Sequence, residues 1–116
     1  MTLGFVETRK FMQVREDYFA GDEAYSAVQQ ALLADPDSGR VMPGCGGLRK
    51  MRWPDPRRGK GKRGGLRIIY LYVPEAEVVV FLKVYDKDDA EDLTPEQRKT
   101  LTQLARTLRE AALSRR

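Results

Sequence analysis

Histidine is absent from this 116-residue sequence, and cysteine and tryptophan occur once each. Histidine is the most common general base near neutral pH and the most common zinc ligand, so its absence argues strongly against a zinc site. Any catalysis would have to come from Lys, Arg, Tyr or carboxylate side chains. The single cysteine, Cys45, cannot form an internal disulfide, which suits a cytoplasmic protein, and we expect it to fill a turn as a small side chain.

Long apolar runs are also missing. No segment approaches the roughly 20 apolar residues of a membrane-spanning helix, and no segment resembles a secretory signal. With 41% hydrophobic and 33% charged residues, the composition is that of a globular protein. The length suits one domain that spans residues 1–116, and we expect it to be cytoplasmic and independent of membranes.

Acidic residues are nearly absent from one part of the chain. Between Arg40 and Arg67 there are ten Lys or Arg and one acid, Asp55, which gives a local balance of +9, although the net charge of the whole chain is only +4. The remainder has 11 basic and 16 acidic residues. One region of the surface should therefore be strongly positive, and this asymmetry indicates a polyanionic partner.

Two consecutive helices are predicted in the first third of the chain. Residues 8–19 place apolar side chains at helical spacing, and Gly21 ends this segment. Asp22 is a suitable N-cap for a second helix over residues 23–35.

A third helix is predicted near the C-terminus, within residues 92–113. Thr94 has the properties of an N-cap, Pro95 occupies the first helical position, and Gln97 completes a capping box. The apolar stripe expected to cover a sheet or a partner consists of Leu101, Leu104, Leu108 and Ala112.

Three segments between these helices have the composition of strands. Residues 48–53 alternate in character, whereas residues 66–73 and 78–85 are rich in β-branched and aromatic side chains. The short connection at 74–77 favours an antiparallel meander, and residues 3–7 are a further short strand candidate.

Two segments could be mistaken for ligand-binding motifs. The acidic run at 86–92, DKDDAED, lacks the ligand order and central glycine of an EF-hand, and acids before a helix are stabilised by its dipole. The sequence GKGKRGG at 59–65 matches neither common phosphate-loop pattern and precedes a strand rather than a helix. We interpret the latter as a flexible, basic hairpin loop.

The functional hypothesis rests on basic residues in the predicted strands. Lys50 and Arg52 are two residues apart on one strand, so they share a face, and Arg67 lies on the next strand. Long cations that project together repel one another unless an anion fills the space, and arginine grips phosphate with a bidentate fork. Aromatic residues are interleaved with these cations and could stack on RNA bases or pack in the core; they are Trp53, Tyr70, Tyr72 and Tyr85.

Three motifs occur in order along the chain: GCGGLRKMRW, GKGKRGGLRIIYLYV and VYDKDDAEDLTPEQ. Together they resemble the HigB branch of the RelE/ParE superfamily, the toxins of type II toxin–antitoxin modules, and the similarity covers roughly residues 3–112. The resemblance implies an α+β microdomain with two N-terminal helices, a twisted antiparallel sheet of three to four strands and a C-terminal helix. It also implies ribosome-dependent, metal-independent mRNA cleavage without a cofactor, by attack of the ribose 2′-hydroxyl on the adjacent phosphate.

The resemblance suggests roles for individual residues. Arg52 and Arg67 are expected to clamp the phosphate, and Lys50 or Lys87 to transfer protons, with Tyr85 as a further candidate because the chain has no His and the last helix has no Tyr. The residues expected to hold RNA are Arg49, Trp53, Lys60, Lys62 and Arg63.

Two other functions stay open from the sequence. A ParE-like inhibitor of DNA gyrase would use the same fold without nuclease chemistry, and a non-enzymatic module would only bind RNA. For a toxin, the expected partners are mRNA, the ribosome and a HigA-type antitoxin with a helix-turn-helix domain. Operator DNA would then be bound only through the toxin–antitoxin complex.

Overall fold

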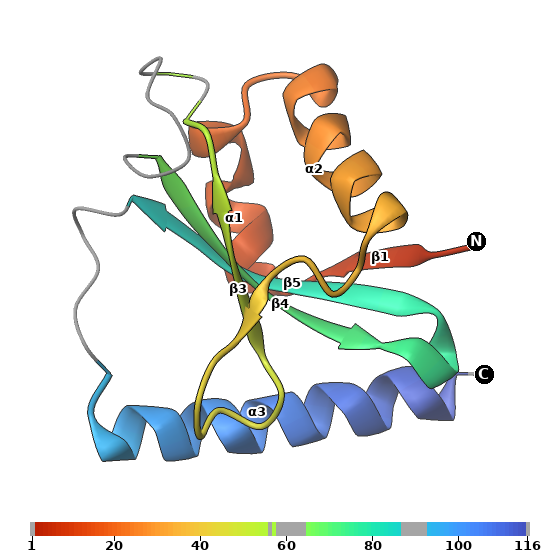
Figure 1. The fold of residues 1–116 in the computed structure, drawn as a ribbon, viewed down its shortest axis with the longest axis vertical. Helices are drawn as coiled ribbons and strands as arrows, with labels where there is room; N and C mark the ends of the chain where they lie inside the picture. Colours follow the sequence, from red (N-terminus) through yellow and green to blue (C-terminus); the bar gives the residue numbers. More distant parts are fainter. Residues whose placement is uncertain (1, 56, 58–64, 87–92, 116) are drawn as a thin grey trace.

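The fold is an α+β arrangement of one sheet with helices on both faces (Figure 1). The computed structural model describes residues 2–55, 57, 65–86 and 93–115. The strands are β1 (Gly4–Glu7), β2 (Arg40–Val41), β3 (Arg49–Trp53), β4 (Leu66–Val73) and β5 (Val78–Asp86). The helices are α1 (Arg9–Tyr18), α2 (Asp22–Ala34) and α3 (Pro95–Ser114), and a 3₁₀ turn, η2 (Pro74–Ala76), joins β4 to β5.

The sheet has five strands in the order β1-β5-β4-β3-β2, rather than the three to four that the sequence predicts. The antiparallel meander of β3, β4 and β5 is confirmed, and so are the two N-terminal helices and the C-terminal helix. Strand β1 pairs with β5 in parallel, with Gly4 opposite Val78. The sequence missed β2 because two residues are too few to show a strand pattern.

The central strand β4 is buried on both faces, so the molecule has two hydrophobic clusters. Helices α1 and α2 cover one face, and α3 covers part of the other (Figure 1). On the α1/α2 side, the buried side chains include Phe11, Phe19, Val28, Leu32, Ile68, Tyr70 and Phe81. On the α3 side, they include Leu48, Ile69, Leu71, Val80, Leu82 and Ala105.

Helix α2 begins one residue before the predicted position. Gly21 is its N-cap, and Asp22 is the first helical residue rather than the cap. Gly21 has a φ of 85°, which a side chain would disfavour, and it makes no side-chain capping bond. Asp22 and Glu23 instead occupy the first turn, where their negative charges interact favourably with the helix dipole.

The predicted capping box of α3 is confirmed. The Thr94 hydroxyl accepts a hydrogen bond from the Gln97 amide at 3.1 Å, and the Gln97 side-chain oxygen accepts one from the Thr94 amide at 2.9 Å. The apolar stripe is partly wrong, because Leu104 is 40% exposed whereas Ala105 is fully buried. Leu101, Leu108 and Ala112 are partly buried and pack against the α3-side cluster.

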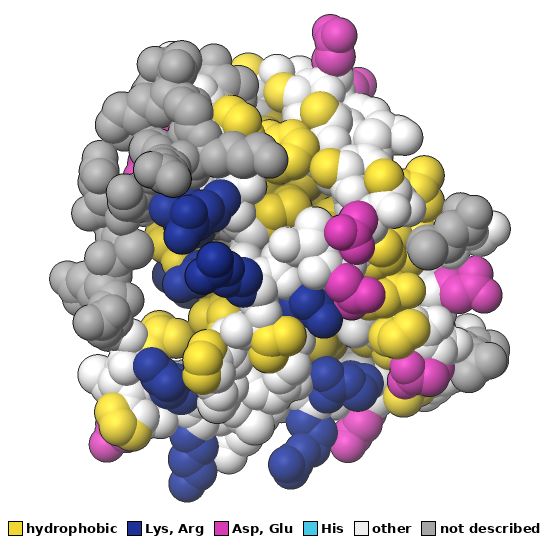
Figure 2. Space-filling model, viewed as in Figure 1, with side chains coloured by type: hydrophobic (Ala, Val, Ile, Leu, Met, Phe, Trp, Pro, Cys, Tyr) yellow, Lys and Arg dark blue, Asp and Glu magenta, His cyan; other side chains and the backbone are white. Residues whose placement is uncertain are grey.

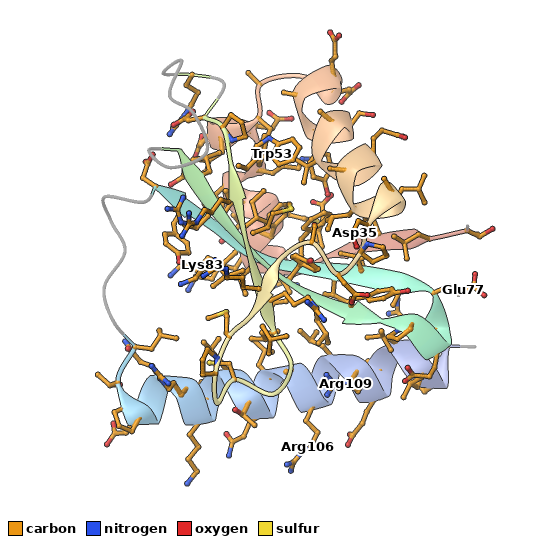
Figure 3. All side chains as sticks on the ribbon, viewed as in Figure 1. Asp35, Trp53, Glu77, Lys83, Arg106 and Arg109 are labelled. Carbon is orange, nitrogen blue, oxygen red and sulfur yellow. The ribbon has the colours of Figure 1, made fainter. Side chains whose placement is uncertain are left out.

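The turn between β2 and β3 is fixed onto α3 by side chains of that helix. The Thr102 hydroxyl donates to the Gly44 carbonyl at 2.9 Å, and Arg109 donates to the Gly46 carbonyl at 3.0 Å (Figure 3). Cys45 is buried in this turn as a small side chain, as the sequence suggested. The contacts hold the β2–β3 hairpin, and with it the start of β3, against the helix.

No helix in the described part of the chain is long and apolar enough to cross a membrane.

Replacement of Gly46 by alanine tests the docking of this turn. The added methyl group would come within 3.1 Å of the Thr102 Cα, and Gly46 has a φ of 70°. We expect the free energy of unfolding, measured in urea, to fall by about 3 kcal/mol. Part of this loss is the strain of an alanine in the left-handed backbone conformation, and the rest is the steric clash of its methyl group with α3. The control is Gly44→Ala in the same turn, where φ is 67° and the nearest atom to the new methyl group is the Arg98 Cδ at 3.9 Å, so only the backbone strain of about 1–2 kcal/mol is expected. Equal losses in both variants would contradict the packing argument.

Candidate nucleic-acid interface

Strand pairing brings the predicted phosphate-binding residues together on one face of the sheet. Arg52 lies directly opposite Arg67, and Arg67 lies directly opposite Tyr85. Lys50 is two residues from Arg52 on β3, and therefore points to the same side. This is the face that α3 covers only in part, and Lys50 and Arg52 are exposed on it.

Two further cations join this face that the sequence analysis did not identify. Arg40 on β2 pairs with Lys50, and Lys83 on β5 pairs with Ile69. Lys83 could have been noticed as the only charge inside the apolar run of β5, but its face depends on the strand register. We call the set of Arg40, Lys50, Arg52, Arg67, Lys83 and Tyr85 the cationic face.

A register shift in β5 gives Lys83 and Tyr85 their orientation. Ile69 pairs with Lys83, whereas the next residue, Tyr70, pairs with Phe81, so Leu82 is an extra residue on β5. Phe81 therefore packs on the α1/α2 side, while Tyr85 lies on the α3 side, although both have odd numbers. An extra residue of this kind re-aims the side chains that follow it, and such bulges are common next to active sites.

The cationic face gathers Lys, Arg and Tyr side chains from four neighbouring strands, β2 to β5. Figure 2 shows Lys and Arg side chains gathered left of centre, with several Asp and Glu side chains to the right. The salt bridges between described residues involve Arg15, Arg49 and Arg57, none of which belongs to this face.

Arg67 is the buried member of the face, with 8% of its surface exposed. Its pKa is lowered, first by burial and then by the positive charge of Arg52, while Tyr85 acts in the opposite direction. One guanidinium nitrogen donates to the Leu66 carbonyl at 3.1 Å. Because the two guanidinium groups repel each other, the binding of an anion between Arg67 and Arg52 is favourable.

Tyr85 stays protonated at neutral pH. Burial raises its pKa above the ordinary value near 10, and the charge of Arg67 offsets only part of this effect. The Lys83 ammonium lies 5.2 Å from the centre of the Tyr85 ring. Tyr85 is therefore a hydrogen-bond donor beside a set of cations.

Two hollows flank Arg40 and Lys50, and each is lined by both of these cations. The Trp53 hollow has a volume of about 560 Å³ and is also lined by Ala31, Ser38, Met51, Arg52, Trp53 and Arg67. The Val41 hollow has a volume of about 590 Å³; its remaining lining is Tyr18, Val41, Met42, Pro43, Cys45, Ile69, Lys83, Val84, Tyr85, Leu93 and Arg98. Among the described residues, no Asp or Glu lines either hollow.

A second cluster of charges lies at the ends of β3 and β5, and sequence reasoning missed it. Two nitrogens of Arg57 donate to the carboxylate of Asp55 at 3.0 and 2.9 Å, and one of them also lies 3.2 Å from Asp86. The Arg57 guanidinium lies 4.5 Å from the centre of the Tyr18 ring. These contacts raise the pKa of Arg57, chiefly through the hydrogen bonds to Asp55. Arg57 thus joins two strand ends to the end of α1.

The other residues predicted to contact RNA occupy different places. Arg49 pairs with Tyr70 and points to the opposite face of β3, where it binds Asp37 at 3.1 Å and the Gly39 carbonyl at 2.7 Å. The structure therefore does not bring Arg49 to the cationic face. Trp53 is partly buried against the α1/α2 cluster and lines one hollow (Figure 3). The predicted residues that lie outside the described part of the chain are Lys60, Lys62, Arg63 and Lys87.

Tyr70 and Tyr72 belong to the core rather than to a stacking surface. Tyr70 is fully buried, and its hydroxyl donates to the Pro36 carbonyl at 2.8 Å and accepts from the Gly39 amide at 2.9 Å. Tyr72 is partly buried and packs against the α1/α2 cluster.

Within the described residues, no three His, Cys, Asp or Glu side chains come together in a way that could hold a metal ion.

A comparison with protein families gives one match that covers most of the chain. The family model described as the RelE toxin of the RelE / RelB toxin-antitoxin system matches residues 8–115. The matched segment contains all three helices and every strand except β1, and it includes the entire cationic face.

Replacement of Arg57 by alanine tests the cluster at the strand ends. Asp55 is 1% exposed, and the variant would lose two hydrogen bonds from Arg57 to its carboxylate. The Arg57 side chain is 34% exposed, so only the Asp55 side of the pair is buried, and we expect a loss of about 1–2 kcal/mol in urea unfolding from the hydrogen bonds that the Asp55 carboxylate loses. Arg106→Ala is the control, because Arg106 is exposed and points away from the sheet (Figure 3), and it should change stability by less than about 0.5 kcal/mol. Similar stabilities of the two variants would contradict the structural role of Arg57.

Proposed function

Because the chain belongs to the RelE family of toxins of type II toxin–antitoxin systems, we propose that it is an endoribonuclease that cleaves mRNA on the ribosome and so inhibits translation. The observation that carries this proposal is the cationic face, where Arg52, Arg67 and Tyr85 are adjacent on three strands. The motif resemblance described above further supports assignment to the HigB branch of the family.

The proposed reaction needs positive charge more than any other feature. The ribose 2′-oxygen attacks the adjacent phosphorus, the bond from phosphorus to the 5′-oxygen breaks, and the products are a 2′,3′-cyclic phosphate and a 5′-hydroxyl. Negative charge accumulates on the phosphate oxygens in the transition state, and fixed cations aimed at that charge are among the larger catalytic contributions. We assign this role to Arg52 and Arg67, whose guanidinium groups can each grip a phosphate oxygen pair.

Two protons move in this reaction. The departing 5′-oxygen gains a proton, for which we assign Tyr85, because burial keeps its hydroxyl protonated beside the cations. The 2′-hydroxyl loses a proton, and we assign this proton transfer to Lys50 or Lys87. Lys60, Lys62 and Arg63 are assigned to the RNA backbone, where cations position the strand without reading its sequence.

Membership of the family also indicates a partner. The family is described by the pairing of a toxin with an antitoxin, and we propose that this toxin is neutralised by a HigA-type antitoxin with a helix-turn-helix domain. Such a domain would bring operator DNA to the complex, since it reads the major groove with one helix.

Replacement of Arg67 by alanine tests the nuclease proposal. In a purified translation system, mapping of mRNA 5′ ends should show cleavage by the unaltered chain and about 100-fold slower cleavage by Arg67→Ala, because one charge-stabilising group is lost. Arg106→Ala should cleave at the normal rate, because Arg106 lies on α3 and points away from the sheet.

The outcome also separates the other candidate functions. Intact messages with DNA damage in expressing bacteria would favour gyrase inhibition. Salt-dependent RNA binding without cleavage would favour a simple binding module. Equal cleavage by Arg67→Ala and the unaltered chain would contradict the assignment of Arg67.

Gel shifts with operator DNA test the proposed partner. The complex of toxin and antitoxin should shift DNA from its own promoter, whereas the toxin alone should not at moderate salt, because the helix-turn-helix domain comes from the antitoxin. A sequence-specific shift by the toxin alone would contradict this division of roles. Scrambled DNA of equal length is the control for non-specific binding by the basic surface.

A further inference from the structure

The proposed phosphate site lies one residue from the ends of three strands. Arg52 is the last residue but one of β3, Arg67 is the second residue of β4, and Tyr85 is the last residue but one of β5. We call these three residues the phosphate row. Strand β1 pairs with β5 only as far as Phe81, and β2 pairs with β3 only as far as Lys50. Among the pairings that the structure describes, β3 and β5 are therefore the outer strands at this end, and strand ends with few neighbours open more easily than the middle of a sheet.

The charges of the phosphate row favour such opening. Arg52 and Arg67 lie directly opposite each other on β3 and β4. Burial and then the charge of Arg52 lower the pKa of Arg67, so both effects disfavour its charged form. Separation of β3 from β4 would hydrate Arg67 and move it away from Arg52. A contact that holds the strand ends together therefore keeps these cations in place.

Arg57 bridges the ends of the two outer strands. Its guanidinium donates hydrogen bonds of 3.0 and 2.9 Å to Asp55, which lies two residues past the end of β3. The Nη2 atom also lies 3.2 Å from a carboxylate oxygen of Asp86, the last residue of β5. Leu66, the first residue of β4, pairs with Trp53 on one side and with Asp86 on the other. Arg57 thus joins two strands that β4 separates.

The bridge is itself fixed to helix α1. The Nη1 atom of Arg57 donates to the Asp17 carbonyl at 3.2 Å, and the guanidinium lies 4.5 Å from the centre of the Tyr18 ring. Both bridged carboxylates are buried, with 1% of Asp55 and 9% of Asp86 exposed. Hydrogen bonds between charged groups are stronger than neutral ones, and salt screens buried pairs only weakly. The bridge therefore restricts the motion of both strand ends.

We propose that Arg57 is a positioning residue for RNA cleavage, because its bridge between the ends of β3 and β5 holds the phosphate row in the arrangement that the reaction needs. This inference rests on the proposed nuclease function. Arg57 contacts α1, which covers the sheet face opposite to the cationic face, so it acts through the strands and not by contact with RNA. A displacement of about 1 Å in catalytic groups can slow a reaction about 100-fold.

Cleavage by Arg57→Ala on programmed ribosomes tests the proposal. The kcat should fall by about tenfold or more, because the phosphate row is displaced. The KM should change by less than about threefold, because the cations that hold RNA are kept. The assay is run at a temperature at which circular dichroism shows every variant to be folded.

Arg15→Ala is the matched control. The Arg15 side chain is 32% exposed, against 34% for Arg57, and it also pairs with a carboxylate, that of Glu7, at 2.8 Å. Its guanidinium likewise lies over a tyrosine ring, 4.8 Å from the centre of Tyr25. This ion pair joins α1 to β1 and not to the phosphate row. Its loss should therefore lower stability by a similar amount and leave kcat unchanged.

Hydrogen exchange tests the strand ends without catalysis. Backbone amides within residues 52–53, 66–67 and 85–86 should exchange about tenfold faster in Arg57→Ala, relative to those at 70–72 in the middle of β4. Arg15→Ala should not show this local difference. Asp86→Ala removes the contact with β5 and keeps the pair of Arg57 with Asp55, and it should reproduce both the faster exchange and the slower cleavage.

Failure of this proposal differs from failure of the nuclease function. If the unaltered chain does not cleave mRNA, the nuclease function fails, and the exchange experiment still decides whether Arg57 holds the phosphate row. If the unaltered chain cleaves, and Arg57→Ala and Asp86→Ala keep the kcat of Arg15→Ala, the positioning role is overturned and the nuclease function stands. Unchanged exchange at the strand ends in Arg57→Ala would also overturn the positioning role.

Discussion

Strand β4 has to be covered on both of its faces, because seven of its eight residues are buried. Burial of Ile68 and Tyr70 requires α1 and α2 on one side, and burial of Ile69 and Leu71 requires α3 on the other. The turn at Gly46 then sits directly on α3, which fixes where β3 begins. The hydrophobic effect at one strand thus sets the positions of all three helices and of the hairpin that carries the basic residues.

The same constraint explains why one end of the α3 side can hold charge. Where α3 no longer covers the sheet, β4 presents Arg67 instead of an apolar residue, and β3 and β5 present Arg52 and Tyr85 beside it. Burial of Arg67 opposite Arg52 opposes folding, because desolvation and repulsion both disfavour its charged form. Burial of the two hydrophobic clusters stabilises the fold by more than burial of Arg67 destabilises it. Folded proteins commonly contain such locally unfavourable groups at sites where they bind a charged ligand.

Much of the fold could be predicted from the sequence, because local patterns specify it. The Thr94 capping box and the limits of β4 follow from residues that are close together in the chain. The direction of β1 and the existence of β2 could not be predicted, since both depend on pairing with distant strands. The site residues show the same division. Lys50 and Arg52 were found from alternation within one strand, and Arg67 from its place on the next strand and from the family resemblance. Lys83 required the register shift at Leu82, which no local pattern indicates.

The sheet also separates the acids from the cations, which a count of charges along the chain cannot reveal. Asp86 follows Tyr85 directly, so the two side chains point to opposite faces, and Asp86 joins Asp55 around Arg57. The acids at these strand ends therefore contact Arg57 and stabilise the fold on the α1/α2 side. Because alternation along a strand directs neighbouring charges to opposite faces, a segment of mixed sign can still present a face that is almost purely positive. The modest net charge of the chain, +4, thus understates the field that a phosphate would meet at this face.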